Sequence, residues 1–259
     1  MKDIAQVLAE AINSLGIINC LCKEETYMYI DWTYIILVLP AVIFSLWASR
    51  KVNTTYQQYQ TQFNSKNITG AQAARFVLDR NGLSNIRIEE ISGTLTDHFD
   101  PSAKVIRLSS GVYGSSSSAA VGVACHEAGH AIQHATNYAP IRLRTAIVPI
   151  TNIGSKLATP LILIGLILGS FLPFFSVIAY IGVACFSLCT IFQLVTLPTE
   201  FNASKRALQC IESNNLLCGN ELEGAKKVLT AAALTYVAAL AVSLTQLLRY
   251  ILILGKRRR

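Results

Sequence analysis

One stretch of 43 consecutive residues, Leu157–Thr199, contains no Asp, Glu, Lys or Arg. As a single α-helix it would be roughly 60 Å long, which is twice the ~30 Å thickness of the hydrocarbon core of a bilayer. Two crossings fit this length, with a break at Gly169–Pro173, which reads GSFLP. We therefore predict a transmembrane hairpin over residues 157–197, with helices at about Leu157–Phe171 and Phe174–Leu197. A pair of core helices in a soluble protein is the alternative, and a charge-free run of this length disfavours it.

Two further apolar segments are candidates for membrane spans. Met28–Ala48 carries Trp32 and Trp47 near its ends, and aromatic residues concentrate at membrane interfaces. Val228–Leu254 is Ala-rich at first and is interrupted by polar residues such as Arg249, so it either crosses the bilayer or packs its first half on protein. The composition agrees with a membrane protein, because 14% of the residues are charged, against roughly 25% in ordinary soluble domains.

The formal charge of +7 is not spread evenly along the chain. The C-terminal tail, residues 255–259, contains four of the 22 basic residues, which leaves 18 basic against 15 acidic residues elsewhere. A basic tail beside apolar segments is typical of attachment to a membrane surface, so we predict the lipid bilayer as a partner and no nucleic acid. The seven cysteines form no C-x-x-C motif and are predicted to be reduced and unpaired. No sequence feature indicates an oligomeric state.

The rest of the chain divides around these spans. Residues 1–27 are predicted to be an N-terminal extension, residues 28–48 the first span, residues 50–156 a polar region, residues 198–227 a helical region after the hairpin, and residues 228–254 a last span. Turn and capping residues in the polar region predict a helix from Thr69 to Asn81, a strand at Ile86–Ile91, a turn at Thr94–Pro101, a strand at Lys104–Leu108, and a helix from the serine run Ser115–Ser118 to about Thr136.

The last of these predicted helices contains the motif His-Glu-Ala-Gly-His at residues 126–130. Residues four apart lie on one face of a helix, so His126 and His130 can bind one metal ion. Glu127 lies beside that face, where it can reach a water molecule on the metal rather than the metal itself. In zinc hydrolases such a water has a pKa of about 7, and a carboxylate takes its proton as a carbonyl is attacked. We therefore predict a zinc site with Glu127 as the general base.

A catalytic zinc normally has three protein ligands and one open position. His134 lies one turn further along the same helix, but three turns of a straight helix cannot converge on one ion. The chain also departs from the extended H-E-x-x-H-x-x-G-x-x-H pattern, in which Thr136 would be a histidine. Glu200 is the better candidate, because it directly follows the hairpin and two crossings return the chain to the side that it left. A carboxylate that snorkels to the membrane interface is the structural alternative for Glu200.

Gly129 stands inside the motif helix, where glycine costs ~1 kcal/mol of helix stability relative to alanine. A close approach by another element would account for it. Ala203 and Ser204 are small and lie one turn after Glu200. We therefore predict that the helix carrying Glu200 meets the motif helix opposite Gly129.

Four segments carry a resemblance to a known family. They are Leu95–Pro101 (LTDHFDP), Val123–Gln133 (VACHEAGHAIQ), Leu197–Ser204 (LPTEFNAS) and Leu234–Ala239 (LTYVAA). Together they resemble the YugP-type neutral zinc metallopeptidases, and the resemblance covers nearly the whole chain after about residue 30. It implies a multi-pass membrane zinc protease of a mostly bacterial family.

A looser similarity is to the HtpX and CAAX-processing membrane metalloproteases, which place a hairpin between H-E-x-x-H and a Glu-x-x-Ala-Asp ligand helix. Glu200 fits that pattern, but Ser204 stands in place of the Asp. If that Asp orients a histidine ligand, His98 or Asp97 could replace it here. His98 could instead stabilise the oxyanion, or it could equally be structural. Tyr236 is a weaker candidate for the oxyanion, because a tyrosine in an Ala-rich helix is more often a packing residue.

These observations predict a mostly α, multi-pass α-helical membrane protein with a small α+β zincin-like catalytic unit. It would be a zinc endopeptidase in which His126, His130 and Glu200 hold Zn2+ and Glu127 is the general base, with His98 as a further catalytic candidate. The strand Lys104–Leu108 is the predicted sheet edge on which an extended polypeptide or membrane-protein substrate pairs through its backbone.

Basic residues also predict the orientation in the cell membrane. They flank the first three spans on one side, whereas the Gly169–Pro173 break carries no charge; they are Arg50, Lys51, Arg142, Arg144, Lys156, Lys205 and Arg206. The positive-inside rule then places the catalytic face in the cytoplasm.

Two alternative functions stay open. One is an intramembrane-cleaving zinc protease, in which H-E-x-x-H would lie inside a span, and the other is a non-catalytic membrane scaffold that binds zinc. The first usually takes a distant Asp-Gly ligand, and the sequence has no Asp-Gly pair. The second is disfavoured because Glu127 would have no function in it.

Overall fold

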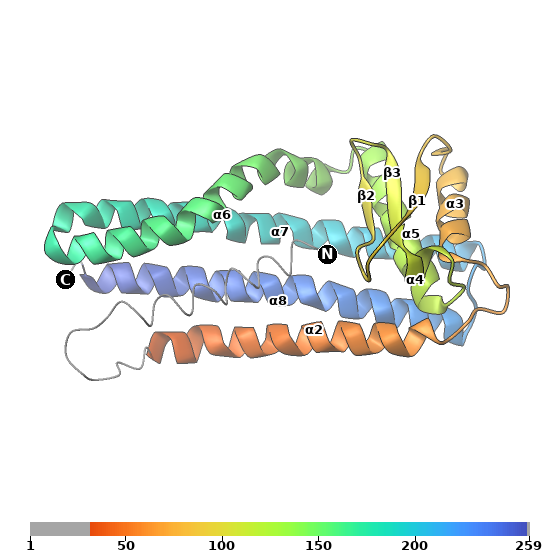
Figure 1. Cartoon of the computed structure of the whole chain (residues 1–259), viewed down its shortest axis with the longest axis horizontal. Helices are drawn as coiled ribbons and strands as arrows, with labels where there is room; N and C mark the ends of the chain where they lie inside the picture. The colour runs from red at the N-terminus through yellow and green to blue at the C-terminus, as the bar shows by residue number, and fades with distance from the viewer. Residues whose placement is uncertain (1–31, 258–259) are drawn as a thin grey trace. The chain divides into compact units, whose positions relative to one another are not determined.

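A computed structural model describes residues 32–257, and Figure 1 labels its elements. The helices are η1 (Tyr34–Val38), α2 (Leu39–Gln60), α3 (Gly70–Arg80), α4 (Ser110–Tyr113), α5 (Ser118–Ala135), α6 (Ala139–Phe171), η2 (Pro173–Phe175), α7 (Ser176–Ser213) and α8 (Asn220–Arg257). The strands are β1 (Arg87–Ile91), β2 (His98–Asp100) and β3 (Val105–Ser109). The predicted N-terminal extension, the start of the first predicted span and the last two residues of the basic tail lie outside the described residues.

The chain is mostly helical with one three-stranded sheet, which confirms the predicted fold class. The described residues divide into two compact units. The α/β unit comprises Trp47–Arg142 and Thr196–Tyr236, and the helical unit comprises residues 32–46, Leu143–Val195 and residues 237–257. The sheet and the short helices α3, α4 and α5 all belong to the α/β unit.

The strand order in the sheet is β1-β3-β2. β1 runs parallel to β3, with Ile88 opposite Ile106, and β2 runs antiparallel to β3, with Phe99 opposite Ile106. The strand predicted at Lys104–Leu108 is therefore the centre of the sheet, and the prediction that it is an edge is wrong. The reason is β2, which lies inside the predicted turn Thr94–Pro101, because three residues are too few to show the alternation that marks a strand.

The core of the α/β unit lies where β3 packs with α3 and α5. Ile106 and Leu108 are fully buried on β3 and join one hydrophobic cluster with Val77 and Leu78 of α3 and Val121 of α5. α7 adds Ala207 and Ile211 to the same cluster. The sheet and α7 thus hold α5 between them, which is what positions the motif residues.

Local capping sets the ends of the two predicted helices. Thr69 caps α3 with a capping box, in which its side chain accepts a hydrogen bond from the Gln72 N–H and the Gln72 side chain accepts one from the Thr69 N–H. Ser117, from the predicted serine run, caps α5 by accepting a hydrogen bond from the Ala120 N–H. α5 ends at Ala135 with Thr136 as its C-cap.

α7 differs from the predicted hairpin helix. It does not end at Leu197 but continues to Ser213, so that Glu200 lies within it rather than at the start of a separate helix. Pro198 is accommodated inside the helix, as are Pro149 and Pro160 in α6. A proline inside a helix removes one intrahelical hydrogen bond and can kink or break the helix. In membrane helices, packing against neighbouring helices allows the helix to continue past it.

α6 and α7 pack closely within the helical unit. The chain reverses between them at Leu172 and η2. A Cβ added to Gly165 would clash with the Ala179 backbone nitrogen, and one added to Gly182 would lie 2.7 Å from the Ile162 nitrogen. Small residues at these contacts let the two backbones approach, as in helix pairs inside membranes.

Four helices in the described part of the chain are long and apolar enough to cross a membrane. They are Tyr34–Gln60, Ala139–Phe171, Pro173–Ser213 and Asn220–Gly255. Large apolar side chains remain exposed along the helical unit, including Ile150, Ile153, Ile181, Leu194 and Ile251. A surface of this kind is stable only when it is covered, and in a membrane lipid tails cover it.

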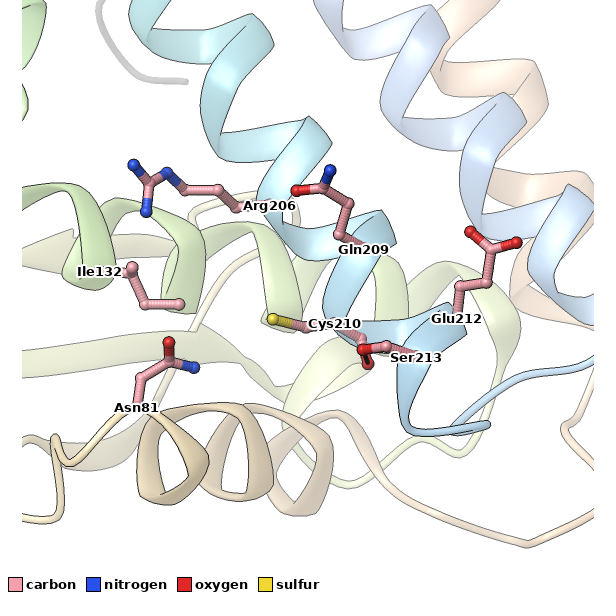
Figure 2. A pocket seen from close by; sticks show the side chains of 7 residues that line it. All are labelled: Asn81, Ile132, Arg206, Gln209, Cys210, Glu212 and Ser213. Atoms are coloured by element: carbon pink, nitrogen blue, oxygen red, sulfur yellow. Dashed lines mark hydrogen bonds between the residues drawn. The ribbon is translucent and has the colours of Figure 1, made fainter.

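An open pocket of about 580 Å³ lies on the α/β unit, beside α7 (Figure 2). Most of its lining comes from one end of α7; the lining residues are Asn81, Ile132, Arg206, Gln209, Cys210, Glu212 and Ser213. None of the predicted metal ligands belongs to this lining.

Candidate metal centre

α5 carries the motif through the middle of the α/β unit, and fifteen of its eighteen residues are buried. Glycines permit this packing at two points. A Cβ on Gly122 would lie 3.2 Å from the Ala225 Cβ, and a Cβ on Gly129 would lie 2.7 Å from the Ala203 carbonyl oxygen. The second contact confirms the predicted close approach of α7 opposite Gly129.

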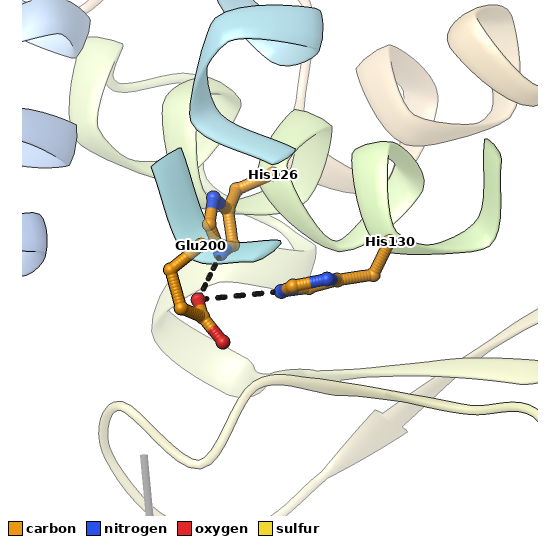
Figure 3. A group of neighbouring side chains, drawn as sticks. All are labelled: His126, His130 and Glu200. Atoms are coloured by element: carbon orange, nitrogen blue, oxygen red, sulfur yellow. Dashed lines mark hydrogen bonds and ion pairs between the residues drawn. The ribbon is translucent and has the colours of Figure 1, made fainter. Parts of the chain in front are cut away.

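This close approach brings Glu200 of α7 to the two histidines of α5 (Figure 3). The Glu200 Oε2 atom lies 3.3 Å from the His126 Nε2 atom and 3.4 Å from the His130 Nε2 atom. One ligand atom from each of the three residues falls within 4.8 Å of the others. The sequence placed two histidines on one helix, and the structure places the carboxylate from the second helix between them.

The donor set fits a zinc ion. Zinc binds imidazole nitrogen and carboxylate oxygen at about 2.0–2.2 Å, so a tetrahedral ion separates its ligand atoms by roughly 3.3 Å. The two measured separations to Glu200 agree with that spacing. Three protein donors also leave a fourth position for water or substrate, which is the pattern of catalytic rather than structural zinc sites.

The electrostatics of Glu200 favour the ionised, metal-binding form. Burial by itself raises the pKa of this carboxyl, but the charges and hydrogen bonds of His130 and His126 outweigh burial and lower the pKa well below its usual range. The Glu200 side chain is 4% exposed, so the site is shielded from bulk water. A buried carboxylate of this kind requires cationic partners.

The outer hydrogen bonds of the histidines differ from the prediction. Ser204 Oγ lies 3.1 Å from His126 Nδ1, and Gln133 Oε1 lies 3.0 Å from His130 Nδ1. Neither Asp97 nor His98 takes this role. Ser204, which stands where the HtpX-like pattern has an aspartate, still contacts His126. The sequence analysis did not identify Gln133. The only sequence feature that could have indicated it is an amide side chain three residues after His130 on a buried helix.

Asp97 has a different task close to the motif. Its carboxylate is 2% exposed and accepts hydrogen bonds from the Ser109 N–H, at 2.7 Å, and the Ser109 hydroxyl. Burial raises the pKa of Asp97, the hydrogen bonds from Ser109 oppose the rise, and the negative charge of Glu127 adds to it. Asp97 therefore ties the start of β2 to the end of β3 near Glu127.

Glu127 is buried on α5, beside the two histidines, with 7% of its surface exposed. It is not among the three residues whose donor atoms converge. This is the arrangement expected of a carboxylate that serves the reaction rather than the metal.

The other candidate histidines, His98 and His134, do not belong to the converging group. His98 is exposed on β2, and its Nδ1 atom lies 2.8 Å from the Thr96 carbonyl oxygen. His134 packs edge-on against Phe99 of β2, with ring centroids 5.5 Å apart. Tyr236 is half-buried on α8. Within residues 32–257, only His126, His130 and Glu200 form a set of three donors close enough to share one ion.

Comparison with known proteins agrees with this geometry. A family model described as "Putative neutral zinc metallopeptidase" matches residues 34–255. The chain is 46% identical, over 220 residues, to a protein of Bacillus subtilis (strain 168) named "Putative membrane protease YugP", and the match covers 85% of this chain and 96% of that protein. No solved structure matches the chain.

Proposed function

This chain belongs to the neutral zinc metallopeptidase family, and we propose that it is a membrane-embedded zinc endopeptidase. His126, His130 and Glu200 would hold the zinc ion, and Glu127 would act as general base. The single observation that supports this proposal most strongly is the convergence of a half-buried imidazole, a buried imidazole and a buried carboxylate from two helices, with a further buried carboxylate beside them.

The residues divide the work of peptide hydrolysis among them. A bound zinc ion would act as a Lewis acid, which lowers the pKa of a water molecule to about 7 and polarises a carbonyl. Glu127 then takes the proton from the attacking water and returns it to the leaving amine. The low exposure of Glu127 and Glu200 excludes bulk water, which strengthens each of these charge interactions.

The substrate would be a polypeptide or a membrane protein presented in an extended form. β2 is an edge of the sheet, because it pairs only with β3, and Phe99 of β2 lies against His134 of α5. An extended peptide that adds to this edge gains backbone hydrogen bonds next to the metal-binding helix. The sheet edge that we propose for the substrate is therefore β2 and not the strand at residues 104–108.

The proposed location is the cell membrane, with the α/β unit in the cytoplasm. Four described helices can span a membrane, and the homologue is named as a membrane protease. Five basic residues of the α/β unit lie next to the spans, whereas the turn at Leu172 has none; they are Arg50, Lys51, Arg142, Lys205 and Arg206. Lys256 and Arg257, at the end of α8, run against this pattern. The positive-inside rule supports this orientation.

Hydrolysis of unfolded casein by the purified, detergent-solubilised chain tests the proposal. We expect activity that a chelator removes and added zinc restores. Glu127→Gln should keep one zinc per chain and lose about 10²–10⁴-fold in hydrolysis, because it removes proton transfer and not a ligand. Glu90→Gln is the matched control, since Glu90 is exposed on β1. Hydrolysis by Glu127→Gln within tenfold of wild type would favour the scaffold alternative.

A further inference from the structure

Gln133 is a fully buried polar residue on α5, and its side chain makes three hydrogen bonds. Its Oε1 atom lies 3.0 Å from His130 Nδ1. Its Nε2 atom donates to the Thr199 carbonyl oxygen at 2.7 Å and to Asn202 Oδ1 at 3.0 Å. One side chain thus connects a histidine of α5 with two residues of α7.

These contacts leave the amide only one orientation. Both acceptors on α7 require N–H donors, so Nε2 must face Thr199 and Asn202, and Oε1 must face His130. Because Oε1 can only accept, His130 must carry its proton on Nδ1. When His130 is neutral, as a metal ligand must be, its other ring nitrogen, Nε2, has the lone pair that a metal ion would take. Nε2 is the atom that lies 3.4 Å from Glu200 Oε2.

The same amide also fixes the turn of α7 that carries the third donor. Thr199 immediately precedes Glu200, and Asn202 follows it by two residues. Asn202 Oδ1 accepts a second hydrogen bond from Arg206 Nε at 2.8 Å, and the Arg206 guanidinium lies over the Tyr138 ring at 5.8 Å. Asn202 therefore cannot turn its amide round without losing both hydrogen bonds.

The partner of His126 is simpler. Ser204 contributes one hydroxyl, which rotates freely and can either donate or accept. Such a contact does not select a tautomer of His126 by itself. The two histidines therefore differ, and only His130 has a partner whose orientation is set by a second helix.

We propose that Gln133 is a positioning residue that sets two of the three metal donors at once, the tautomer of His130 and the placement of the Glu200 turn. The inference rests on the proposed metal site. Outer partners of metal-binding histidines typically contribute 10–100-fold to metal affinity. The distinguishing expectation is that Gln133 affects zinc affinity more than it affects the stability of the metal-free chain.

Gln133→Met tests the proposal, because it keeps the length of the side chain and removes all three hydrogen bonds. Gln193→Met is the matched control, since Gln193 is also a buried glutamine, on α7 in the helical unit. Zinc affinity is measured by competition with a chromophoric chelator on the full chain in detergent, and the melting temperature is measured with the metal removed. We expect a 10–100-fold loss of affinity in Gln133→Met and none in Gln193→Met.

Gln133→Glu separates the two halves of the role. A carboxylate still accepts from His130 but cannot donate to Thr199 and Asn202 when ionised. Asn202→Ala removes one α7 contact and leaves the His130 contact in place. We expect both variants to bind zinc more tightly than Gln133→Met and less tightly than wild type. If Gln133→Met does not fold, this pair decides: wild-type zinc affinity in both would overturn the proposal.

The remaining outcomes separate this proposal from the proposed function. If wild type binds one zinc and Gln133→Met binds it with equal affinity, the positioning role is overturned and the metal site stands. If Gln133→Met lowers the metal-free melting temperature but not the zinc affinity, Gln133 is a packing residue only. If wild type binds no zinc, the proposed function itself fails.

Discussion

The α/β unit and the helical unit of this chain are stabilised in different ways. The α/β unit buries 25 residues in one hydrophobic cluster, whereas the cluster of the helical unit contains five. Large apolar side chains of the helical unit stay exposed, and its described residues contain no Asp or Glu. The α/β unit holds all three converging donors, and two of its buried carboxylates, Asp97 and Glu200, have hydrogen-bond partners.

This difference shows which solvent each unit is suited to. In a unit that folds in water, a buried charged group needs a partner to offset its desolvation cost, and the closed apolar core provides most of the stability. A unit in lipid gains nothing from hiding apolar side chains, so close backbone packing at small residues takes over. The three converging donors and Glu127 all lie in the α/β unit, and the variants below should separate the two units.

The largest effect is expected at the third donor. Glu200→Ala should lose bound zinc and activity together, by at least about 100-fold, because it removes one of three donors and leaves two histidines of one helix. His134→Ala should keep most of both, since His134 packs on Phe99 and not in the converging group. Metal analysis of the two purified variants decides this. A full zinc site in Glu200→Ala, or an empty one in His134→Ala, would contradict the assignment.

The orientation of the two units across the membrane gives an all-or-none readout. Cys218 is exposed in the α/β unit between α7 and α8, and Ser170 is exposed at the α6–α7 turn. In a chain with Cys218 as its single cysteine, a membrane-impermeant thiol reagent should label it only after the cells are opened. A chain with Ser170→Cys as its single cysteine should be labelled from outside. The reverse pattern would overturn the proposed cytoplasmic location.

Two glycines test helix packing in one unit at a time. Gly129→Ala places a Cβ 2.7 Å from the Ala203 carbonyl oxygen, and Gly165→Ala places one against the Ala179 backbone nitrogen. Each should cost about 1–3 kcal/mol of unfolding free energy. Only Gly129→Ala should also weaken zinc binding, because its contact, Ala203, lies one turn after Glu200 on α7, whereas Ala179 lies near the other end of that helix.

Gly114→Ala is the control for these two variants, since a Cβ there meets nothing within 4 Å. Thermal unfolding with and without zinc measures both quantities. Equal loss of zinc affinity in Gly129→Ala and Gly165→Ala would show that the metal site depends on both units, and the comparison between them would fail.

The smallest effect is expected at an ion pair on the sheet. Hydrogen bonds from Ser102, Arg107 and the Ala103 N–H lower the pKa of Asp100 well below its usual range. A lowered pKa stabilises the fold above the unfolded value of about 3.9 and loses this effect as the pH falls below it. Asp100→Asn should therefore cost about 0.2–1 kcal/mol at neutral pH.

Denaturant unfolding at several pH and salt values measures this contribution. The difference between wild type and Asp100→Asn should shrink at high salt and below about pH 4. A difference that is constant from pH 3 to pH 7 would assign the effect to packing rather than to charge.

Much of the fold was predictable because it depends on local patterns. Thr69 and Ser117 cap their helices through their own side chains, and the charge-free run of Leu157–Thr199 reflects the medium rather than any neighbour. His126 and His130 are brought together by one turn of helix. Their convergence needs no tertiary contact, so the sequence alone predicts it.

The missed features depend on contacts between distant segments. β2 is a strand only because Phe99 and its neighbours pair with β3, and that pairing makes β3 the centre of the sheet. The continuity of α7 through Pro198 depends on support from packed helices and not on propensity. No local pattern in the sequence carries either fact.

The candidate site divides in the same way. The sequence by itself determined the two histidines on one helix face, Glu127 beside them, and the small residues Gly129 and Ala203, because helix periodicity and side-chain volume follow from residue order. Only the tertiary structure decided which groups orient the histidines. Ser204 and Gln133 each make a hydrogen bond between α5 and α7. Such a bond depends on donor–acceptor distances to within a few tenths of an ångström, and only the packing of the two helices sets those distances.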